Sequence, residues 1–240
     1  MNTVPLLQLD GVSVGVGDTP ICHDVSLTIQ QGETHVLLGP NGSGKSSLLH
    51  AIMGVGPFNI LAGSVKFQGK EISELSTSER ATLGIGMAFQ RPPKLPGVTV
   101  TQLAKAMHAD SRVAAAAEDL RLSHLENREV NCGFSGGETK RWEIMKLLLQ
   151  KPQLCLFDEP ESGVDLEHVA VVGKTVSKFL QEPGEQGNRG ALIVTHTGFI
   201  LDHVDADIAH LMVDGRIVEH NDPLTLFERI RQYGYSPEGK

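Results

Sequence analysis

The octapeptide at residues 39–46 constrains this chain more than any other stretch. It carries a glycine, four free positions and then Gly-Lys-Ser, the pattern of a loop that wraps a phosphate. The apolar segment 36–38 before it predicts a buried strand, and residues 47–52 predict the start of a helix. Strand, glycine-rich loop and helix together favour an anion site made of backbone N–H groups at a helix N-terminus. A glycine-rich turn with a chance lysine is the alternative.

The side chains of this loop predict a nucleotide bound with a metal ion. Lys45 should reach the β- and γ-phosphates, and the Ser46 hydroxyl should face Mg²⁺. Glycines let the backbone approach the phosphates with no side chain in the way. The expected nucleotide contacts are Gly39, Pro40, Asn41, Gly42, Ser43, Gly44, Lys45, Ser46 and Ser47.

The composition limits the possible partners. The 240 residues, 40% of them hydrophobic, suffice for one large domain or for a core with a subdomain. The net charge of −8 gives no electrostatic footprint for nucleic acid or for an anionic membrane surface. No apolar run has the length of a membrane span, and the first five residues do not form a secretory signal. We therefore expect a cytoplasmic protein that neither binds nucleic acid nor inserts into a membrane.

The three cysteines, Cys22, Cys132 and Cys155, are odd in number and far apart. They form no Cys-x-x-Cys pair, so neither a disulfide framework nor a zinc site is indicated. We expect all three to be buried as small apolar side chains. A redox or metal role for Cys22, which precedes His23, is the alternative.

The first third of the chain alternates between short strands and turns. Its strand patterns indicate an antiparallel sheet beside the nucleotide-binding core. The run 76–79 has the pattern of a helix cap, and residues 85–89 predict a buried strand that ends at Gln90. The predicted strands of the antiparallel sheet are 6–12, 25–29 and 64–67.

A helical insert is predicted next. Residues 91–97 contain three prolines, so they cannot be helix interior or central strand and instead predict a rigid exposed connector. Residues 99–149 are mostly helical in pattern, and the last helix, from about Gly137 to Gln150, is stopped by Lys151-Pro152. We expect a helical subdomain at about 91–150, inserted in a single domain that spans 1–240.

The remainder alternates strands with helices, which predicts a parallel, doubly wound α/β core. Buried strands are predicted at 154–157 and 191–195. Asp214-Gly215 joins two apolar segments as a hairpin, and residues 224–233 close the chain as an amphipathic helix. The helix between the buried strands should bury residues at helical spacing, namely Val169, Val172, Val176 and Phe179.

Two acids follow the predicted strand 154–157. Asp158 is placed to hold Mg²⁺ opposite Ser46, directly or through water. Glu159, one residue further on, is the candidate general base for an attacking water. An acidic pair that merely caps the next turn is the alternative.

Ser135-Gly136-Gly137 forms a second anion-binding nest at a predicted helix start. One chain has no need of two γ-phosphate nests, but two chains related by a twofold axis do, if each closes the other's site. At this point the sequence resembles the ATP-binding cassette (ABC) ATPases over nearly its whole length. The remaining matches are Gln90 to the Q-loop, residues 161–165 to the D-loop and His196 to the switch histidine.

The resemblance implies an ABC-type P-loop NTPase with a parallel core sheet, an N-terminal antiparallel β subdomain and an inserted helical subdomain. It implies ATP and Mg²⁺ as cofactors and an ATP-dependent head-to-tail homodimer. It further implies that His196 contacts the γ-phosphate and positions water, that Gln90 touches Mg²⁺ and water, and that Asp165 and the Ser135–Gly137 nest contact nucleotide. From the residues alone, Gln90 and His196 could be ordinary polar residues at strand ends.

Recognition of the base is less well defined. ABC ATPases usually stack adenine on an aromatic residue some way before the phosphate loop. The segment 12–20 offers only Val14 and Val16 there. A preference for ATP over GTP is therefore implied by the resemblance alone.

Within the family, the chain is similar to the SufC group, the soluble ATPases of iron–sulphur cluster assembly. Glu161 stands where transporter subunits usually carry Thr, and Lys140 where they usually carry Gln. This resemblance implies a SufB/SufD-like scaffold protein as the partner whose conformation ATP hydrolysis changes. The other segments that carry it are 88–90, 96–99, 133–138 and 232–235.

Two alternative functions belong to the same family. Pro160 is typical of transporters, so the nucleotide-binding subunit of a membrane ABC transporter is the main alternative. A DNA-repair or ribosome-associated ABC protein is disfavoured by the net acidity, the lack of a coiled-coil insertion and the single cassette.

Two further expectations concern communication with a partner. We expect the partner to dock along residues 91–98, with a plain linker as the alternative. Lys140, in the first turn of the signature helix, is expected to pair with the Glu159 carboxylate, and a solvated surface lysine is the alternative.

Overall fold

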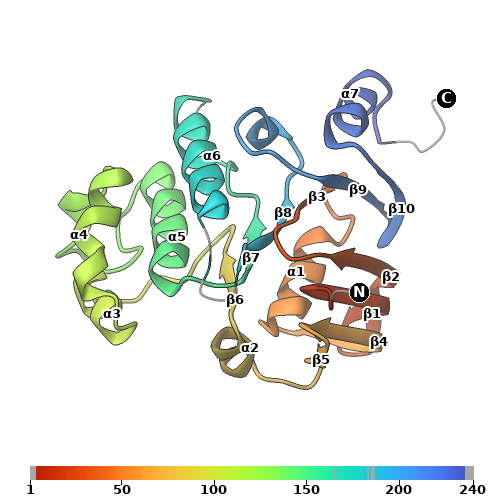
Figure 1. Cartoon of the computed structure of the whole chain (residues 1–240), viewed down its shortest axis with the longest axis horizontal. Helices are drawn as coiled ribbons and strands as arrows, with labels where there is room; N and C mark the ends of the chain where they lie inside the picture. The colour runs from red at the N-terminus through yellow and green to blue at the C-terminus, as the bar shows by residue number, and fades with distance from the viewer. Residues whose placement is uncertain (1–3, 165, 183, 185–186, 236–240) are drawn as a thin grey trace.

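The computed structural model describes residues 4–164, 166–182, 184 and 187–235. Figure 1 shows two sheets side by side with helices between and around them, and a group of helices set apart at one end. The predicted α/β class is confirmed: the structure has a parallel core, an antiparallel N-terminal sheet and a helical insert. No described helix has the length and apolar character needed to cross a membrane.

The core sheet has the strand order β10-β9-β3-β8-β7-β6, and all neighbours except the β9–β10 hairpin are parallel. Every residue of β3, β6, β7 and β8 is buried, as expected for parallel strands covered on both faces. The strand bounds are β3 Thr34–Leu38, β6 Ile85–Ala88, β7 Leu154–Asp158, β8 Gly190–Val194, β9 Ile208–Val213 and β10 Arg216–Asn221.

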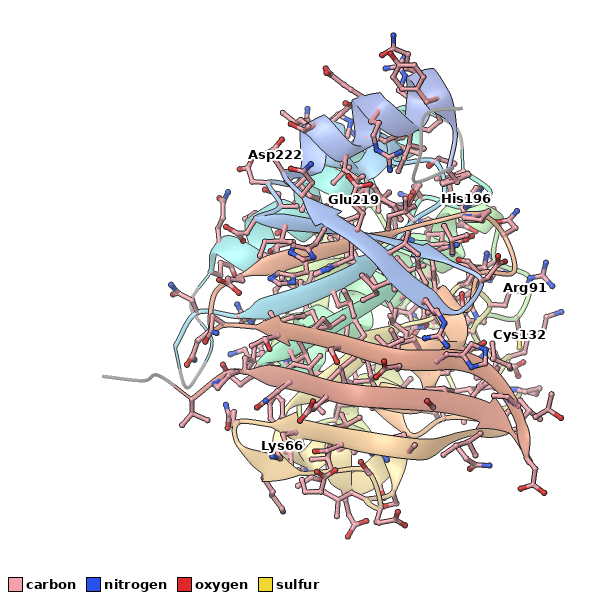
Figure 2. The ribbon with its side chains drawn as sticks, turned by 90° about the vertical axis from the view of Figure 1, so that its right-hand side faces the viewer. Lys66, Arg91, Cys132, His196, Glu219 and Asp222 are labelled. Carbon is pink, nitrogen blue, oxygen red and sulfur yellow. The ribbon has the colours of Figure 1, made fainter. Side chains whose placement is uncertain are left out.

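The antiparallel sheet has the order β2-β1-β4-β5 and its strands are longer than predicted. β1 (Leu7–Val16) and β2 (Thr19–Ile29) meet in a tight turn at Gly17, whose φ of 55° suits glycine. β4 (Phe58–Phe67) pairs with β1 along its length, so backbone pairing extends the strand through residues whose side chains show no clear alternation. β5 covers Lys70–Glu71. Figure 2 shows this sheet in the lower half of the view, where Lys66 of β4 is labelled.

Helix α1 (Lys45–Met53) fills the space between the two sheets. Its buried face joins one core cluster with side chains of β1, β2 and β4 and of the core strands. α2 (Thr77–Leu83) begins at a capping box made by Ser76 and Glu79, which confirms the predicted cap.

The other face of the core sheet is covered by α6 (Leu166–Gln181), η2 (Phe199–Asp202) and α7 (Pro223–Tyr233), together with part of α5. The apolar spacing predicted for α6 is confirmed, because its four residues are all buried. The hairpin between β9 and β10 turns at Asp214 and Gly215, both with positive φ, as Asp-Gly predicted.

The helical insert lies between β6 and β7 in the sequence. It contains α3 (Val100–Ala106), α4 (Asp110–Asp119), η1 (Ser123–Leu125) and α5 (Gly136–Gln150), packed around the buried Trp142. α5 ends where Lys151 adopts φ 54° before Pro152, as predicted. Residues 91–97 lead into this insert, and Leu95 is bonded through its backbone N–H to the carbonyl of Val130.

The cysteine prediction is correct for two of the three residues. Cys22 and Cys155 are buried, and burial raises their pKa values to about 11 and about 12 respectively. Cys132 is only half-buried, so the expectation of burial is wrong there. It lies in the loop before α5, where the Arg128 guanidinium donates a hydrogen bond to the Cys132 carbonyl.

Candidate active site

The phosphate-binding loop links β3 to α1 in the predicted order of strand, loop and helix. Gly39 and Gly44 have positive φ, and neither position has room for a side chain. A Cβ on Gly39 would lie 2.1 Å from the Met212 carbonyl oxygen, and one on Gly44 would lie 2.9 Å from Cys22 Sγ. These contacts fix the loop against β9 and β2 with its backbone exposed toward the cleft.

Lys45, the first residue of α1, is folded back onto its own loop. Its Nζ donates hydrogen bonds to the carbonyls of Gly39 and Pro40, both at 2.8 Å. Burial lowers the pKa of Lys45, while the negative charges of Glu159 and Asp158 act in the opposite direction. The ammonium group is thus held at the loop that would receive the phosphates.

Ser46 and Asp158 meet at the expected metal position. The Ser46 hydroxyl donates to Asp158 Oδ1 at 2.7 Å, and His50 Nε2 lies 3.5 Å from Asp158 Oδ2. Mg²⁺ takes oxygen ligands, and a hydroxyl beside a carboxylate at the phosphate loop fits that requirement. These two residues would hold Mg²⁺, whose charge would help to neutralise the phosphates.

Glu159 lies just beyond β7 and is nearly buried, with 6% relative exposure. Its carboxylate accepts a hydrogen bond from the Gln90 side-chain amide. His196 Nδ1 lies 3.0 Å from Glu159 Oε1, without the alignment of a hydrogen bond. The three residues predicted to be catalytic are therefore brought together, and the amide nitrogen of Gln90 faces Glu159 rather than Asp158.

These groups surround one cleft of about 480 Å³. Ser162 of the predicted D-loop also lines it, and so does Ile21, which belongs to none of the predicted motifs. Val14 is buried in the core and Val16 is 40% exposed, so the apolar residue at the cleft is Ile21 of β2. The register of β1 against β2 pairs Val14 with Cys22, and this pairing places Ile21, not Val14 or Val16, at the cleft. The register cannot be read from the sequence. The remaining lining residues are Asn41, Gly42, Gly44, Lys45, Ser46, Ser47, Gln90, Glu159 and His196.

The second glycine nest lies at the start of α5. The Ser135 hydroxyl accepts from the Glu138 N–H at 3.2 Å, and the Glu138 carboxylate accepts from the Ser135 N–H at 2.7 Å. Ser135 and Gly136 are exposed, and the nest does not line its own chain's cleft. Asp165, also expected at the nucleotide, lies outside the described residues.

Lys140 differs from both expectations for it. It is buried, with 6% relative exposure, so it is not a surface lysine. Its Nζ donates to the backbone carbonyls of Gln90 at 3.0 Å and Glu159 at 2.9 Å. The expected pairing with the Glu159 carboxylate is wrong, because that carboxylate is engaged by Gln90 and His196 instead.

Glu161, in the loop after Glu159, is bonded to the loop that carries His196. Its Oε1 accepts hydrogen bonds from the hydroxyls of Thr195 and, at 2.9 Å, Thr197. Burial raises the pKa of Glu161, against the effect of these hydrogen bonds. The D-loop and the switch-histidine loop of one chain are therefore directly connected.

Comparison with known proteins gives consistent matches. The family profile described as "ABC transporter" matches residues 22–162. A probable ATP-dependent transporter, SufC, of Escherichia coli K12 is 34% identical, over 96% of this chain and 97% of its own length. A probable ATP-dependent transporter, ycf16, of Cyanidium caldarium is 33% identical, over 98% and 97%. A probable ABC transporter ATP-binding protein of Streptococcus pyogenes serotype M18 is 35% identical, over 96% and 94%.

Solved structures agree on the fold. An ATP-binding cassette of an ABC transporter in its ADP conformation superposes with a TM-score of 0.77 at 25% identity, covering 98% of this chain and 96% of that one. A dimeric ATP-binding cassette in a post-hydrolysis state, bound to ADP and phosphate, gives 0.76 at 21% identity, covering 90% and 98%.

Proposed function

Because this chain belongs to the ABC transporter family of ATP-binding domains and is an ABC-type ATPase, we propose that it drives a conformational change in a SufB/SufD-like scaffold of iron–sulphur cluster assembly. The observation that carries the proposal is its similarity to the Escherichia coli SufC protein over nearly the full length of both chains. The buried carboxylate of Glu161, where transporter subunits usually carry Thr, supports the same assignment. Such a protein acts in the cytoplasm.

The proposed chemistry assigns one task to each group in the cleft. The glycine-rich loop and Lys45 bind the phosphates of ATP, and Ser46 and Asp158 hold Mg²⁺. Glu159 takes the proton of the attacking water, and His196 beside it orients that water toward the γ-phosphate. Gln90, bonded to Glu159, responds to the occupancy of the cleft and passes the change to residues 91–98.

The proposed assembly is an ATP-dependent head-to-tail homodimer. Each chain supplies one phosphate loop and one Ser135–Gly137 nest, and Ser135 and Gly136 of the nest are exposed. A second copy, turned by a twofold axis, would bring its nest to the γ-phosphate of the first. The N–H groups at the start of α5 would then neutralise phosphate charge across the interface.

The partner is proposed to dock on the connector 91–98. In Figure 2, Arg91 lies on the same edge of the molecule as His196. Arg91 and Lys94 are exposed, while Leu95 packs against the core of the helical insert. Substitutions of the two charged residues therefore test docking without disturbing that core.

The test is co-purification of the tagged chain with a co-expressed scaffold. Reversing both charges, Arg91→Glu with Lys94→Glu, should abolish capture of the scaffold and leave basal ATP hydrolysis intact. Lys70→Glu, an equally exposed change on the antiparallel sheet, is the matched control and should leave capture unchanged. Full capture by the double variant would refute docking on the connector.

A membrane transporter subunit is the alternative function. Pro160 and the similarity to the Streptococcus pyogenes transporter protein favour it. The same co-purification separates the two functions, because a transporter subunit would bring down a membrane-embedded partner in detergent and not a soluble scaffold.

A further inference from the structure

The loop that carries His196 is contacted by the C-terminal part of the chain. The Tyr235 hydroxyl donates a hydrogen bond of 2.9 Å to the His196 carbonyl, across 39 residues of sequence. The chain reaches this point from α7, through Gly234 with φ 76°. In Figure 2, α7, which follows Asp222, lies above His196. The contact therefore joins the last described residue to the loop at the catalytic cleft.

A second contact from α7 fixes the same loop. Gly198 has φ 71°, and a Cβ there would lie 2.1 Å from Cε2 of the Phe227 ring. On its other side the loop is tied by the Thr195 hydroxyl, which accepts from the N–H groups of Thr197 at 3.2 Å and Gly198 at 2.9 Å. The loop is thus held before and after His196, and Tyr235 is the group that holds the carbonyl of His196 itself.

The chemistry of Tyr235 suits a permanent donor. Its ring packs against the core cluster that α6 and α7 share, so the side chain has a fixed position. Burial raises the pKa of its hydroxyl, and the negative charge of Glu159 raises it further. A tyrosine normally ionises near pH 10, so this hydroxyl keeps its proton at neutral pH and continues to donate.

We propose that Tyr235 is a positioning residue for ATP hydrolysis, whose hydroxyl holds the His196 backbone so that the imidazole faces Glu159. Two contacts lead from Tyr235 to Glu159. Tyr235 Oη donates to the His196 carbonyl, and His196 Nδ1 lies 3.0 Å from Glu159 Oε1. Without the hydroxyl, the peptide after His196 keeps only the hydrogen bond from the Thr197 N–H to the Thr195 hydroxyl, so the direction of the imidazole is less firmly fixed. The inference rests on the proposed role of His196.

The test is Tyr235→Phe, which removes only the hydroxyl. We expect kcat to fall about 3- to 10-fold, the size expected for loss of one hydrogen bond that acts on the transition state. KM for ATP should stay at the wild-type value, since the phosphate loop is untouched, and the thermal midpoint should fall by at most about 2–4 °C, the effect of losing one partly buried hydrogen bond. Tyr233→Phe, at the exposed last residue of α7, is the matched control and should keep wild-type kcat.

The His196→Ala background shows whether Tyr235 acts through the imidazole. His196→Ala keeps the backbone carbonyl and removes the ring, so adding Tyr235→Phe should cause no further loss of kcat. A wild-type kcat in Tyr235→Phe, or an undiminished further loss in the His196→Ala background, would overturn the inference while leaving His196 in its role. If His196→Ala itself keeps full kcat, the proposed role of His196 fails, and the inference fails with it.

Discussion

Lys140 joins the two strand ends that carry the catalytic side chains. Its buried ammonium group donates to the Gln90 and Glu159 carbonyls, beyond the ends of β6 and β7. A buried carbonyl without a donor is costly, so this lysine stabilises the local backbone of both residues. Lys140 thus fixes where the side chains of Gln90 and Glu159 begin and leaves the Glu159 carboxylate to its other partners.

Replacing Lys140 tests that interpretation. Lys140→Met should lower the free energy of unfolding by about 1–3 kcal/mol, because the partly buried Gln90 carbonyl loses its donor and the Glu159 carbonyl keeps only the Ser162 N–H. It should not raise the basal ATPase rate. Urea unfolding and phosphate release measure the two effects, and Lys178→Met, at an exposed position on α6, is the control. A several-fold faster rate at unchanged stability would instead support a lysine that restrains the Glu159 carboxylate.

At the residue scale, sequence motifs identified the polar groups of the cleft but not its apolar wall. The phosphate loop, Glu159 and His196, which line the cleft, each belong to a local pattern at the end of a buried strand. Ile21 belongs to no such pattern and reaches the cleft through the pairing of β2 with β1. The acceptors of Lys140 are backbone carbonyls, which leave no mark on the sequence.

At the scale of elements, the N-terminus of α5 carries a capping box whose Glu138 carboxyl has a lowered pKa. Hydrogen bonds from His124 and Ser135 lower the pKa of Glu138 to about 2. The folded pKa lies below the ordinary value of 4.5, so ionised Glu138 stabilises the fold above that pH. This stabilisation is lost as the pH falls from 4.5 toward 2.

Glu138→Ala should therefore destabilise the protein in a pH-dependent way. The expected loss is about 1 kcal/mol at neutral pH, the usual worth of a helix cap. The difference from wild type in urea midpoint should shrink between about pH 5 and about pH 3. Glu118→Ala, on an exposed site of α4, is the control and should show no such trend. A difference that stays constant across this range would contradict the assigned charge state.

Elements with local signals were predicted better than those defined by pairing. The caps at Ser76 and Ser135 and the stop at Lys151 confirmed helix bounds, because side chains and φ values close to the helix set them. β1, β2 and β4 extend further than predicted, because hydrogen bonds between strands, and not side-chain alternation, determine their ends.

At the scale of the whole molecule, the proposed complete site needs two chains. The cleft contains the phosphate loop and the catalytic side chains, but Ser135 and Gly136 of the nest are exposed outside it. A dimer that forms only around ATP explains why a chain carries both features. Hydrolysis would then release the two copies and reset the connector at 91–98.

Analytical sedimentation of the Glu159→Gln variant tests this requirement most directly. The variant lacks the proton acceptor, so bound ATP should persist and hold two chains together. We predict a dimer with Mg-ATP, a monomer with Mg-ADP, and a monomer with Mg-ATP when Ser135→Arg is added to block the nest. A chain that binds Mg-ATP and stays monomeric at every accessible concentration would contradict the account.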